Sequence, residues 1–363
     1  MKNNRKIISI LIICNLFWSV SVPAQHFNKK EIISQMTKVA DWQLAQSWST
    51  DKPGNPPTGS RSWEAGAFYP GVADAYRATK NGKYLEALKL MAEANQYERG
   101  PQLRNADDQA ILQTYLEMYA FTRDPKLLTA TKRTLDSIML SPKPGRVEYS
   151  WCDLLFMGPP IWSRYSAITK DQKYLDYLTE IYWDASENLQ NKTYKLFYRD
   201  NRFKTIVGPS GKPIFWSRGN GWVVAGLART LEAMPARYPV RKKYENLLIE
   251  LASSLKSLQQ PDGFWKSDLL DPQVYPMGET SGTAFFCYGI AWAINHKLLD
   301  RNEYLPVVLK AWNALNGAVL ADGKLGFVQP GGDRPYLSKS NMSNWYAAGG
   351  FLMAGNQVLK FAR

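Results

Sequence analysis

Two kinds of helical pattern alternate along most of the chain. The first kind is amphipathic, and it opens near a Lys-Tyr-Leu-like cluster that recurs at Lys83, Lys126, Lys173 and Lys243. The second kind is rich in aromatic and small residues and is apolar nearly all round. A helix that is apolar all round needs complete burial, whereas an amphipathic helix can face solvent on one side. The alternation therefore predicts an inner and an outer layer of helices.

Six helices of the apolar kind are predicted. Their expected bounds are Glu64–Thr79, Asp107–Thr122, Asp153–Thr169, Asn220–Met234, Ser281–Leu298 and Trp345–Lys360. Strand patterns are sparse, and only Lys195–Arg199 and Lys212–Phe215 are expected to pair as a small hairpin. An open solenoid is the alternative arrangement, but it needs polar capping repeats that the sequence does not contain. The sequence therefore predicts an all-α fold, a closed (α/α)6 barrel of six inner and six outer helices.

The first 24 residues have a different character. Basic residues precede an apolar run, Ile7–Val20, and a small-residue cleavage site follows at Val22-Pro23-Ala24. This pattern is typical of a secretory signal peptide, and the run is too short for a membrane-spanning helix. We therefore expect a signal peptide at 1–24, a single domain at 25–363, no membrane span and a periplasmic location.

Cysteine and histidine are scarce after this leader. The cysteines are Cys152 and Cys287, which allow one disulfide at most, and the histidines are His26 and His296. His296 falls in a predicted helix, where a packed or surface histidine is the ordinary case. Histidine triads, histidine-rich zinc sites and Cys/His nucleophile pairs are therefore disfavoured. Any chemistry must come from carboxylates, tyrosine, lysine or arginine, and we expect no metal and no cofactor.

The net charge of +13 falls to +10 when the three basic residues of the leader are removed. Because the basic residues are scattered rather than gathered in blocks, nucleic-acid binding is not favoured, and attraction of a polyanionic substrate explains the charge as well.

Residues that break the apolar pattern fall at the starts of the predicted inner helices. They are Trp63-Glu64, Asp107-Asp108, Asp153, Arg218-Gly219-Asn220, Glu279 and Asn344. In a closed ring of this kind all six starts open on the same face, so these side chains are expected to meet at one mouth. The alternative is that Asp, Ser and Asn at helix starts only cap the helices, and this is the favoured interpretation for Asp108 and Ser281 taken alone.

The segment Trp216–Trp222 is the most specific one. It reads Trp-Ser-Arg-Gly-Asn-Gly-Trp, so two tryptophans bracket Arg218, and two glycines let backbone approach closely. Rings for stacking and a planar cation that pairs with a carboxylate suit an acidic sugar. A packed turn with a structural arginine is the alternative interpretation.

Asp153 is the only charged residue in the apolar and aromatic segment Tyr149–Met157. Burial disfavours a carboxylate and raises its pKa, as a general acid at neutral pH requires. The polarity of a helix start opposes this shift, but a second carboxylate from Asp107 or Asp108 would restore it.

These motifs together resemble glycoside hydrolase family 105, which comprises unsaturated rhamnogalacturonyl hydrolases and is related to the family 88 unsaturated glucuronyl hydrolases. The resemblance rests on the Trp-x-Asp-x-x-Phe-Met stretch at 151–157, on Trp216–Trp222 and on Glu279-Thr280-Ser281-Gly282-Thr283. It covers the chain from Trp63 to Ala354-Gly355 and implies an (α/α)6 barrel. It also implies a hydrolase that removes the terminal 4,5-unsaturated uronic acid from lyase-generated oligosaccharides by hydrating the C4=C5 bond, without a cofactor.

The resemblance also implies residue roles. Asp153 matches the general acid/base, and Asp107 matches the second essential aspartate, although the adjacent Asp108 leaves the register open. Many relatives have a histidine in the Leu-Phe-Tyr segment where this chain has Arg199 followed by Asp200, which leaves the preferred sugar or linkage open. The residues expected to contact the acidic oligosaccharide are Trp63, Asp108, Arg199, Trp216, Arg218, Trp222 and Glu279.

Two alternative functions remain at this point. One is a conventional glycoside hydrolase on the same barrel, and the other is a non-catalytic periplasmic protein that binds carbohydrate.

The uninterrupted repeat predicts one catalytic domain at 25–363, because no Pro/Gly-rich linker divides the repeat. We expect limited proteolysis to leave a single stable core. Two fragments that fold independently of each other would contradict this organisation.

Overall fold

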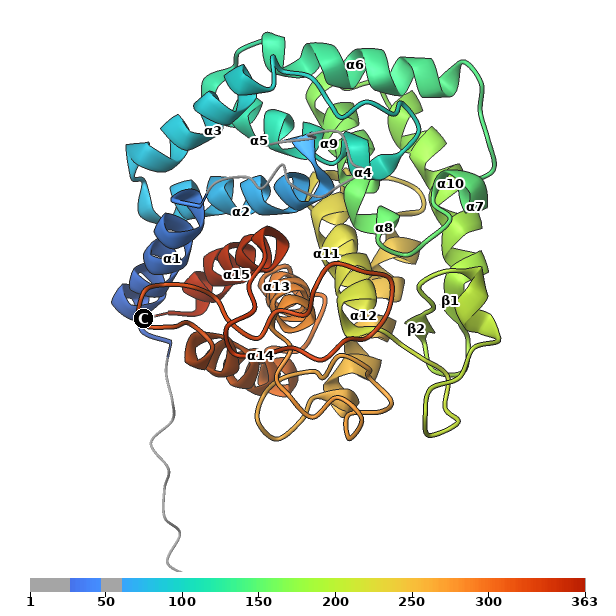
Figure 1. The fold of residues 1–363 in the computed structure, drawn as a ribbon. Helices are drawn as coiled ribbons and strands as arrows, with labels where there is room; N and C mark the ends of the chain where they lie inside the picture. Colours follow the sequence, from blue (N-terminus) through green and yellow to red (C-terminus); the bar gives the residue numbers. More distant parts are fainter. Residues whose placement is uncertain (1–26, 47–60, 363) are drawn as a thin grey trace, which may run out of the picture.

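Two concentric layers of helices make up the described part of the chain in the computed structural model, which covers residues 27–46 and 61–362 (Figure 1). The expected signal peptide and His26 lie outside the described residues. The inner layer comprises α2 (Trp63–Thr79), α4 (Ala106–Gln109) with α5 (Leu112–Thr122), α8 (Leu154–Met157) with α9 (Pro159–Thr169), α11 (Ser217–Ala233), α13 (Thr280–Asn295) and α15 (Trp345–Val358). The outer layer comprises α1 (Lys29–Leu44), α3 (Gly82–Ala94), α6 (Lys126–Met139), α10 (Lys173–Leu189), α12 (Arg241–Leu258) and α14 (Arg301–Gly317).

The inner helices form a closed ring. Each contacts the next in chain order, and α15 returns to pack along α2. Glycine makes this last contact possible, because a methyl group on Gly349 would lie 2.2 Å from the carbonyl oxygen of Ala67. The structure therefore confirms the (α/α)6 barrel and contradicts the open solenoid.

Burial follows the two sequence patterns. In α13 every residue from Thr280 to Ile294 is buried, whereas α6 buries one stripe that contains Leu127, Leu135 and Ile138. None of the helices in the described ranges is long and apolar enough to cross a membrane.

The third inner helix is interrupted, although the sequence predicted it as continuous. Pro159 and Pro160 begin α9, and proline has no N–H to donate to the preceding turn. The side-chain amide of Gln113 replaces the missing donors, because its Nε2 donates to the carbonyl oxygens of Phe156 (2.9 Å) and Met157 (3.2 Å). The second inner helix is also divided, between Gln109 and Leu112, where the turn is closed by i→i+3 hydrogen bonds.

The predicted hairpin is wrong in its pairing. The strand β2 (Leu196–Phe197) pairs antiparallel with β1 (Gln190–Asn191), which directly follows α10. Pro213 forms an isolated bridge with Val207 instead of joining β2. Each segment therefore pairs with a neighbour closer along the chain than we expected.

The two cysteines and His296 are packed against neighbouring parts of the protein. Cys152 and Cys287 are buried and free, so they form no disulfide with each other. His296 stacks on Trp292 at 4.0 Å between ring centroids, and its Nδ1 lies 2.8 Å from the Trp292 carbonyl oxygen. His296 is therefore a packed helix-end residue, as the sequence predicted.

A buried ion cluster links four inner helices in the half of the barrel away from the mouth. Glu117 of α5 pairs with Arg77 of α2, with Arg164 of α9 (2.8 Å) and with Arg229 of α11 (3.0 Å). Burial raises the pKa of Glu117, but the charges of the three arginines outweigh burial and hold that pKa below its ordinary value. Arg229 also donates from Nε to Gln113 Oε1 at 2.8 Å, so the cluster supports the residue that bridges the break in the third inner helix.

We predict that Glu117→Gln lowers the free energy of unfolding by roughly 3 kcal/mol, because it leaves buried arginine charge without a counter-ion. The matched control is Glu187→Gln, which removes an exposed partner of Lys243 and should change the free energy of unfolding by less than about 0.5 kcal/mol. Denaturant titration followed by circular dichroism measures both values. Equal stabilities for the two variants would contradict a structural role for the cluster.

Candidate active site

The starts of the inner helices meet at one end of the barrel, as the sequence predicted. The ring of Trp63 from α2 stacks on Tyr346 from α15 at 5.2 Å and meets the edge of Trp222 from α11 at 6.3 Å. Ser217 at the start of α11 donates from Oγ to Glu279 at the start of α13, at 3.1 Å. These contacts join four helix starts directly, so the mouth is a single site.

Asp153 lies immediately before α8 in a mostly apolar wall. The residue is 9% exposed, and its carboxylate makes no capping hydrogen bond to the following turn. Burial raises the pKa of Asp153, and the charges of Arg199 and Arg218 oppose that rise without cancelling it. The carboxyl group is therefore able to hold a proton at higher pH than an exposed aspartate.

Asp107, in α4, lies close enough to Asp153 for the charge of Asp153 to act on it. Burial and the charge of Asp153 raise the pKa of Asp107 to about 7, against the lowering effect of Arg199. Asp153 is buried and Asp107 is partly buried. Two such carboxyl groups with interacting charges retain a proton toward neutral pH, which is the condition for general acid catalysis.

Asp108 has a different environment from its neighbour. Its carboxylate accepts a hydrogen bond from the backbone N–H of Gln102 at 2.9 Å, and a methyl group on Gly100 would overlap it. Burial raises the pKa of Asp108, and the Gln102 hydrogen bond and the charges of Arg99 and Arg61 oppose that rise; Arg199 is not among these groups. The geometry therefore selects Asp107 rather than Asp108 as the partner of Asp153, which the sequence had left open. It also places Asp108, expected among the substrate contacts, against the Gln102 backbone.

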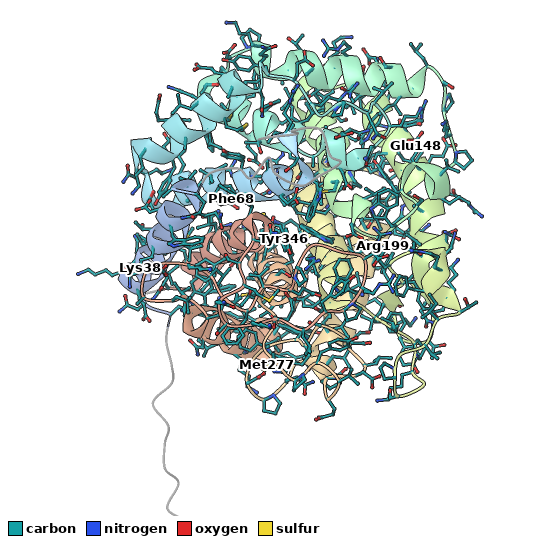
Figure 2. The ribbon with its side chains drawn as sticks, viewed as in Figure 1. Lys38, Phe68, Glu148, Arg199, Met277 and Tyr346 are labelled. Atoms are coloured by element: carbon teal, nitrogen blue, oxygen red, sulfur yellow. The ribbon has the colours of Figure 1, made fainter. Side chains whose placement is uncertain are left out.

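Arg199 follows β2 and lies beside Asp153. Its Nε is 3.5 Å from Asp153 Oδ2, and its Nη1 donates to Asp200 Oδ2 at 2.8 Å. The guanidinium also covers the ring of Trp151 at 4.9 Å. Figure 2 shows Arg199 and Tyr346 near the centre of the view, where they approach the mouth from different elements.

Arg218 does not present a free guanidinium, contrary to our expectation. It is 1% exposed and lies between the rings of Trp216 (4.3 Å) and Tyr346 (4.7 Å). Its Nη groups donate to the carbonyl oxygens of Gln329 (3.2 Å) and Pro330 (2.8 Å). Arg218 therefore holds the segment 327–344, which we call the strap, and the Nε atom is the part of its guanidinium left without a partner.

The strap crosses the barrel end between α14 and α15 and passes in front of α11 (Figure 1). Gln329 is its main anchor, because its side-chain oxygen accepts from Trp216 Nε1 at 2.9 Å and its carbonyl oxygen accepts from the Tyr346 hydroxyl at 2.6 Å. The Gln329 carbonyl lies more than a hundred residues from Arg218 along the chain, so the sequence around Arg218 could not predict this hydrogen bond.

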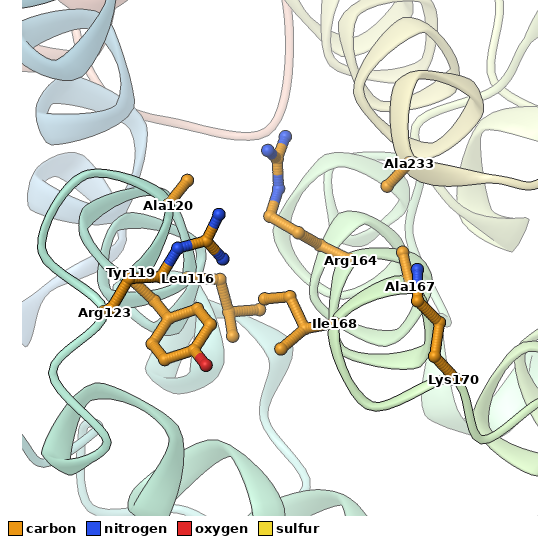
Figure 3. Close-up of a pocket in the computed structure, with 9 residues that line it drawn as sticks. All are labelled: Leu116, Tyr119, Ala120, Arg123, Arg164, Ala167, Ile168, Lys170 and Ala233. Carbon is orange, nitrogen blue, oxygen red and sulfur yellow. The ribbon is translucent and has the colours of Figure 1, made fainter.

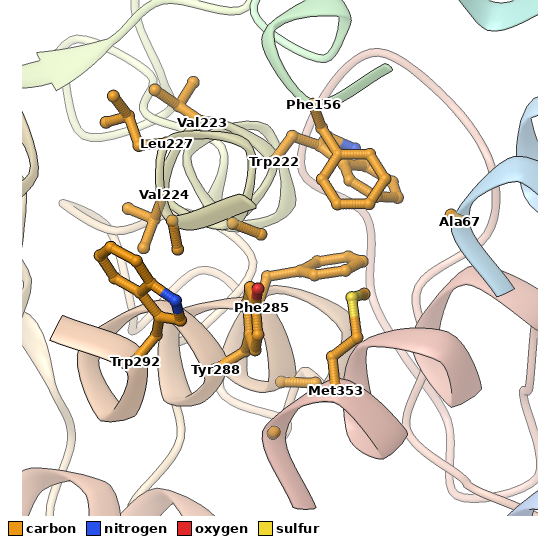
Figure 4. Packing of buried hydrophobic residues seen from close by; sticks show 14 of the residues in the cluster. Ala67, Phe156, Trp222, Val223, Val224, Leu227, Phe285, Tyr288, Trp292 and Met353 are labelled. Carbon is orange, nitrogen blue, oxygen red and sulfur yellow. The ribbon is translucent and has the colours of Figure 1, made fainter. Parts of the chain in front are cut away.

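The tryptophans divide into buried and accessible ones. Trp216 and Trp222 are 2% and 1% exposed, and Trp222 packs against Phe156 and Phe285 in the core (Figure 4). Trp63 and Trp151 are partly exposed at the mouth. A sugar ring can therefore reach Trp63 and Trp151, whereas Trp216 and Trp222 support the wall behind them.

Glu279 caps α13. Its carboxylate accepts hydrogen bonds from the N–H groups of Ser281 (2.9 Å) and Gly282 (2.7 Å) and from the hydroxyls of Ser217 and Ser281. It has no exposed surface, so a direct contact with substrate would require this helix start to open.

Known proteins share both this sequence and this fold. The model of Glycosyl Hydrolase Family 88 matches residues 25–362, which is nearly the whole chain. The chain belongs to glycosyl hydrolase family 88. The expected likeness to family 105 and its relative family 88 is thereby confirmed, and the protein is an enzyme rather than a carbohydrate-binding module.

Among relatives of this family 88 member, the unsaturated 3S-rhamnoglycuronyl hydrolase of Formosa agariphila is 37% identical over 99% of both chains. The enzyme of the same name from an Alteromonas species is 33% identical over 88% of this chain and 84% of its own. The solved structure of a family 88 glycosyl hydrolase from Bacteroides vulgatus superimposes with a TM-score of 0.84 at 29% identity, covering 92% of this chain and all of that one.

A pocket of about 370 Å³ opens at the other end of the family 88 barrel (Figure 3). Its cations include Arg123 and Lys170, which directly follow α5 and α9. Cations at helix C-termini offset the negative end of the helix dipole, so their presence has a structural cause. None of the expected site residues lines this pocket.

Two residues of the site, Gln329 and Tyr346, were not singled out from the sequence, and Trp151 was quoted only as part of the 151–157 stretch, without a role. Gln329 and Tyr346 anchor the strap, and Trp151 carries the guanidinium of Arg199. The Pro330-Gly331-Gly332 turn was the one signal near Gln329, and it predicts a loop without saying what the loop covers.

We predict that Asp107→Asn lowers kcat on the order of 100-fold or more, because it removes a carboxyl group that interacts with Asp153. Because burial and the charge of Asp153 raise the pKa of Asp107, the variant removes the higher titration of the pair, so the alkaline limb of the kcat profile should move to lower pH. The matched control is Asp108→Asn, which keeps an acceptor for Gln102 N–H and should retain activity within a few-fold. Steady-state kinetics across pH decide between the two, and the reverse ranking would overturn the assignment of Asp107.

Proposed function

We propose that this site removes the terminal 4,5-unsaturated uronic acid from rhamnose-linked oligosaccharides that a polysaccharide lyase has produced. Membership of family 88 and the two relatives that span most of the chain support the unsaturated uronyl hydrolase activity. The single observation that carries the mechanism is the pair of Asp153, which is buried, and Asp107, which is partly buried, because burial raises the pKa of both carboxyl groups.

The chemistry starts from an enol ether, because a lyase leaves a C4=C5 double bond next to the ring oxygen. Protonated Asp153 delivers its proton to C4, and the positive charge spreads over C5 and the ring oxygen as an oxocarbenium ion. The new Asp153 carboxylate then takes a proton from a water molecule that attacks C5. The hemiketal at C5 opens the ring to a C5 ketone, and the hemiacetal left at C1 collapses to an aldehyde and releases the shortened oligosaccharide. One water molecule is consumed, and Asp153 returns to its protonated form.

The surrounding residues suit an acidic sugar. Trp63 and Trp151 offer partly exposed rings for stacking at the mouth, and Arg199 places a cation at its wall. The two relatives are named for a 3S-rhamnoglycuronyl substrate, and a rhamnose unit would lie outward of the uronic acid, on the accessible side of these rings. We also propose that the protein acts in the periplasm, where its leader would direct it.

A conventional glycoside hydrolase is the alternative on this barrel, and it would place acid and base on either side of the glycosidic bond of a saturated sugar. The two relatives, which are named unsaturated rhamnoglycuronyl hydrolases, favour hydration of a double bond.

The decisive test follows the ultraviolet absorbance of the conjugated double bond while the enzyme acts on lyase-treated ulvan, pectin or glycosaminoglycan fragments. Wild-type enzyme should remove the absorbance of at least the rhamnose-containing fragments. Asp153→Asn keeps the shape of the side chain but cannot donate a proton to carbon, so kcat should fall on the order of 100- to 10,000-fold with little change in binding.

Two outcomes would contradict the proposal. Release of sugar from saturated substrates with the absorbance unchanged would indicate the conventional mechanism. Near wild-type activity of Asp153→Asn together with an inactive Asp107→Asn would show that the roles of the two aspartates are assigned the wrong way round.

A further inference from the structure

We propose that Arg199 is a positioning residue for this reaction: its guanidinium holds Asp153 in place and stabilises the carboxylate that forms there, and Asp200 fixes the guanidinium in turn. This inference rests on the proposed function, since it concerns the proton donor of that same site.

The backbone around Arg199 is joined to the backbone around Asp153. Trp151 forms an isolated antiparallel bridge with Asp200, and the N–H of Cys152 donates to the carbonyl oxygen of Arg199 at 2.8 Å. Arg199 and Asp153 are therefore held in register by hydrogen bonds that do not depend on their own side chains.

The guanidinium of Arg199 is itself held on two sides. It lies over the ring of Trp151 at 4.9 Å, and its Nη1 donates to Asp200 Oδ2 at 2.8 Å. This leaves Nε directed at Asp153 Oδ2 at 3.5 Å, with no hydrogen bond of its own. The side chains of Arg199 and Asp153 are 17% and 12% exposed, so solvent screens their attraction only in part.

Asp200 is the fixed point of this arrangement. Its Oδ1 accepts from the N–H of Arg202 at 2.9 Å and from Arg202 Nε at 3.0 Å, and its Oδ2 accepts from Arg202 Nη2 at 2.8 Å. Arg202 also reaches the strap, because its Nη2 donates to Asp333 Oδ2 at 2.8 Å. A chain of alternating charges therefore runs from Asp153 through Arg199, Asp200 and Arg202 to the strap.

Arg199 is the cation shared by the two site aspartates. Burial raises the pKa of Asp153, and Arg199 opposes that rise more than Arg218 does. Burial and Asp153 raise the pKa of Asp107, and Arg199 opposes that rise as well.

Other groups face the pair but do not replace this cation. The Cys152 thiol lies 3.6 Å from Asp153 Oδ2, and the negative charges of Asp108 and Glu64 act on Asp107. The Nη groups of Arg218 donate to carbonyl oxygens of the strap instead.

A cation in this position has a defined effect on the reaction. When Asp153 gives its proton to C4, a negative charge appears 3.5 Å from Arg199 Nε. A fixed cation stabilises that carboxylate without having to reorganise, and it keeps the carboxylate oriented for the attacking water. The same cation prevents the pKa of Asp153 from rising so far that the proton is no longer released.

The test compares kcat, KM and the pH profile of kcat for three variants on the unsaturated substrate. Arg199→Gln should lower kcat about 10- to 100-fold with little change in KM. Because removal of the cation raises the pKa of both aspartates, the alkaline limb of its kcat profile should move to higher pH. Arg199→Lys keeps the charge but loses the planar fork, so its limb should stay near that of wild type while kcat falls less.

Asp200→Asn tests the anchor separately. Asparagine still accepts the hydrogen bond from Arg202 N–H but loses the charge that fixes Arg199, so kcat should fall with KM nearly unchanged. The matched control is Arg146→Gln, which breaks an exposed pair with Asp184 and should leave kcat and its pH profile unaltered.

Three results would overturn the inference. The first is a rise in KM with kcat unchanged in Arg199→Gln, which would make Arg199 a substrate contact. The second is an alkaline limb of the kcat profile that does not move in that variant. The third is an equal movement of this limb in Arg146→Gln, which would reflect the overall charge of the protein. An inactive wild-type enzyme would instead refute the proposed function, so the two failures are distinguishable.

Discussion

The close packing of α15 along α2 is the contact on which the rest of the structure depends. Without it, helix pairs would stack as an open row, and the last apolar helix would expose one face to water. The contact requires backbone to meet backbone, since a side chain on Gly349 would overlap the carbonyl of Ala67. Closure buries all six apolar helices, and it also forces their starts to one end of the barrel.

The two ends of the ring use charge in opposite ways. In the half away from the mouth, Glu117 neutralises arginines from three other helices, and this satisfied cluster supports the interrupted third helix through Gln113. At the mouth, the charges of Asp153 and Asp107 interact, and Arg199 pairs with Asp153. The first arrangement stabilises the ring, whereas in the second, burial raises the pKa values of both carboxyl groups and Arg199 opposes that rise.

The strap lies across the end of the barrel where the mouth opens (Figure 1). Arg218, Trp216 and Tyr346 all bond to Gln329. The most specific motif of the sequence therefore works partly through a loop far along the chain. The sequence allowed two interpretations of Trp216–Trp222, a site for an acidic sugar and a packed turn with a structural arginine. Both hold in part, because the segment lies at the mouth while the hydrogen bonds of Arg218 hold the strap.

The sequence by itself determined the helix order, the inner and outer layers, the closed barrel and the gathering of the unusual residues at one mouth. These features depend on local hydrophobic periodicity and on the need to bury apolar helices, and both are written in the order of residues. The sequence also singled out Asp153 from its apolar surroundings. Only the tertiary structure decided between Asp107 and Asp108, because adjacent residues of one helix turn point to different neighbours. It likewise turned Arg218 and Glu279 inward and set Arg199 against Asp153, since hydrogen bonds and ion pairs depend on which distant segments closure of the ring brings together.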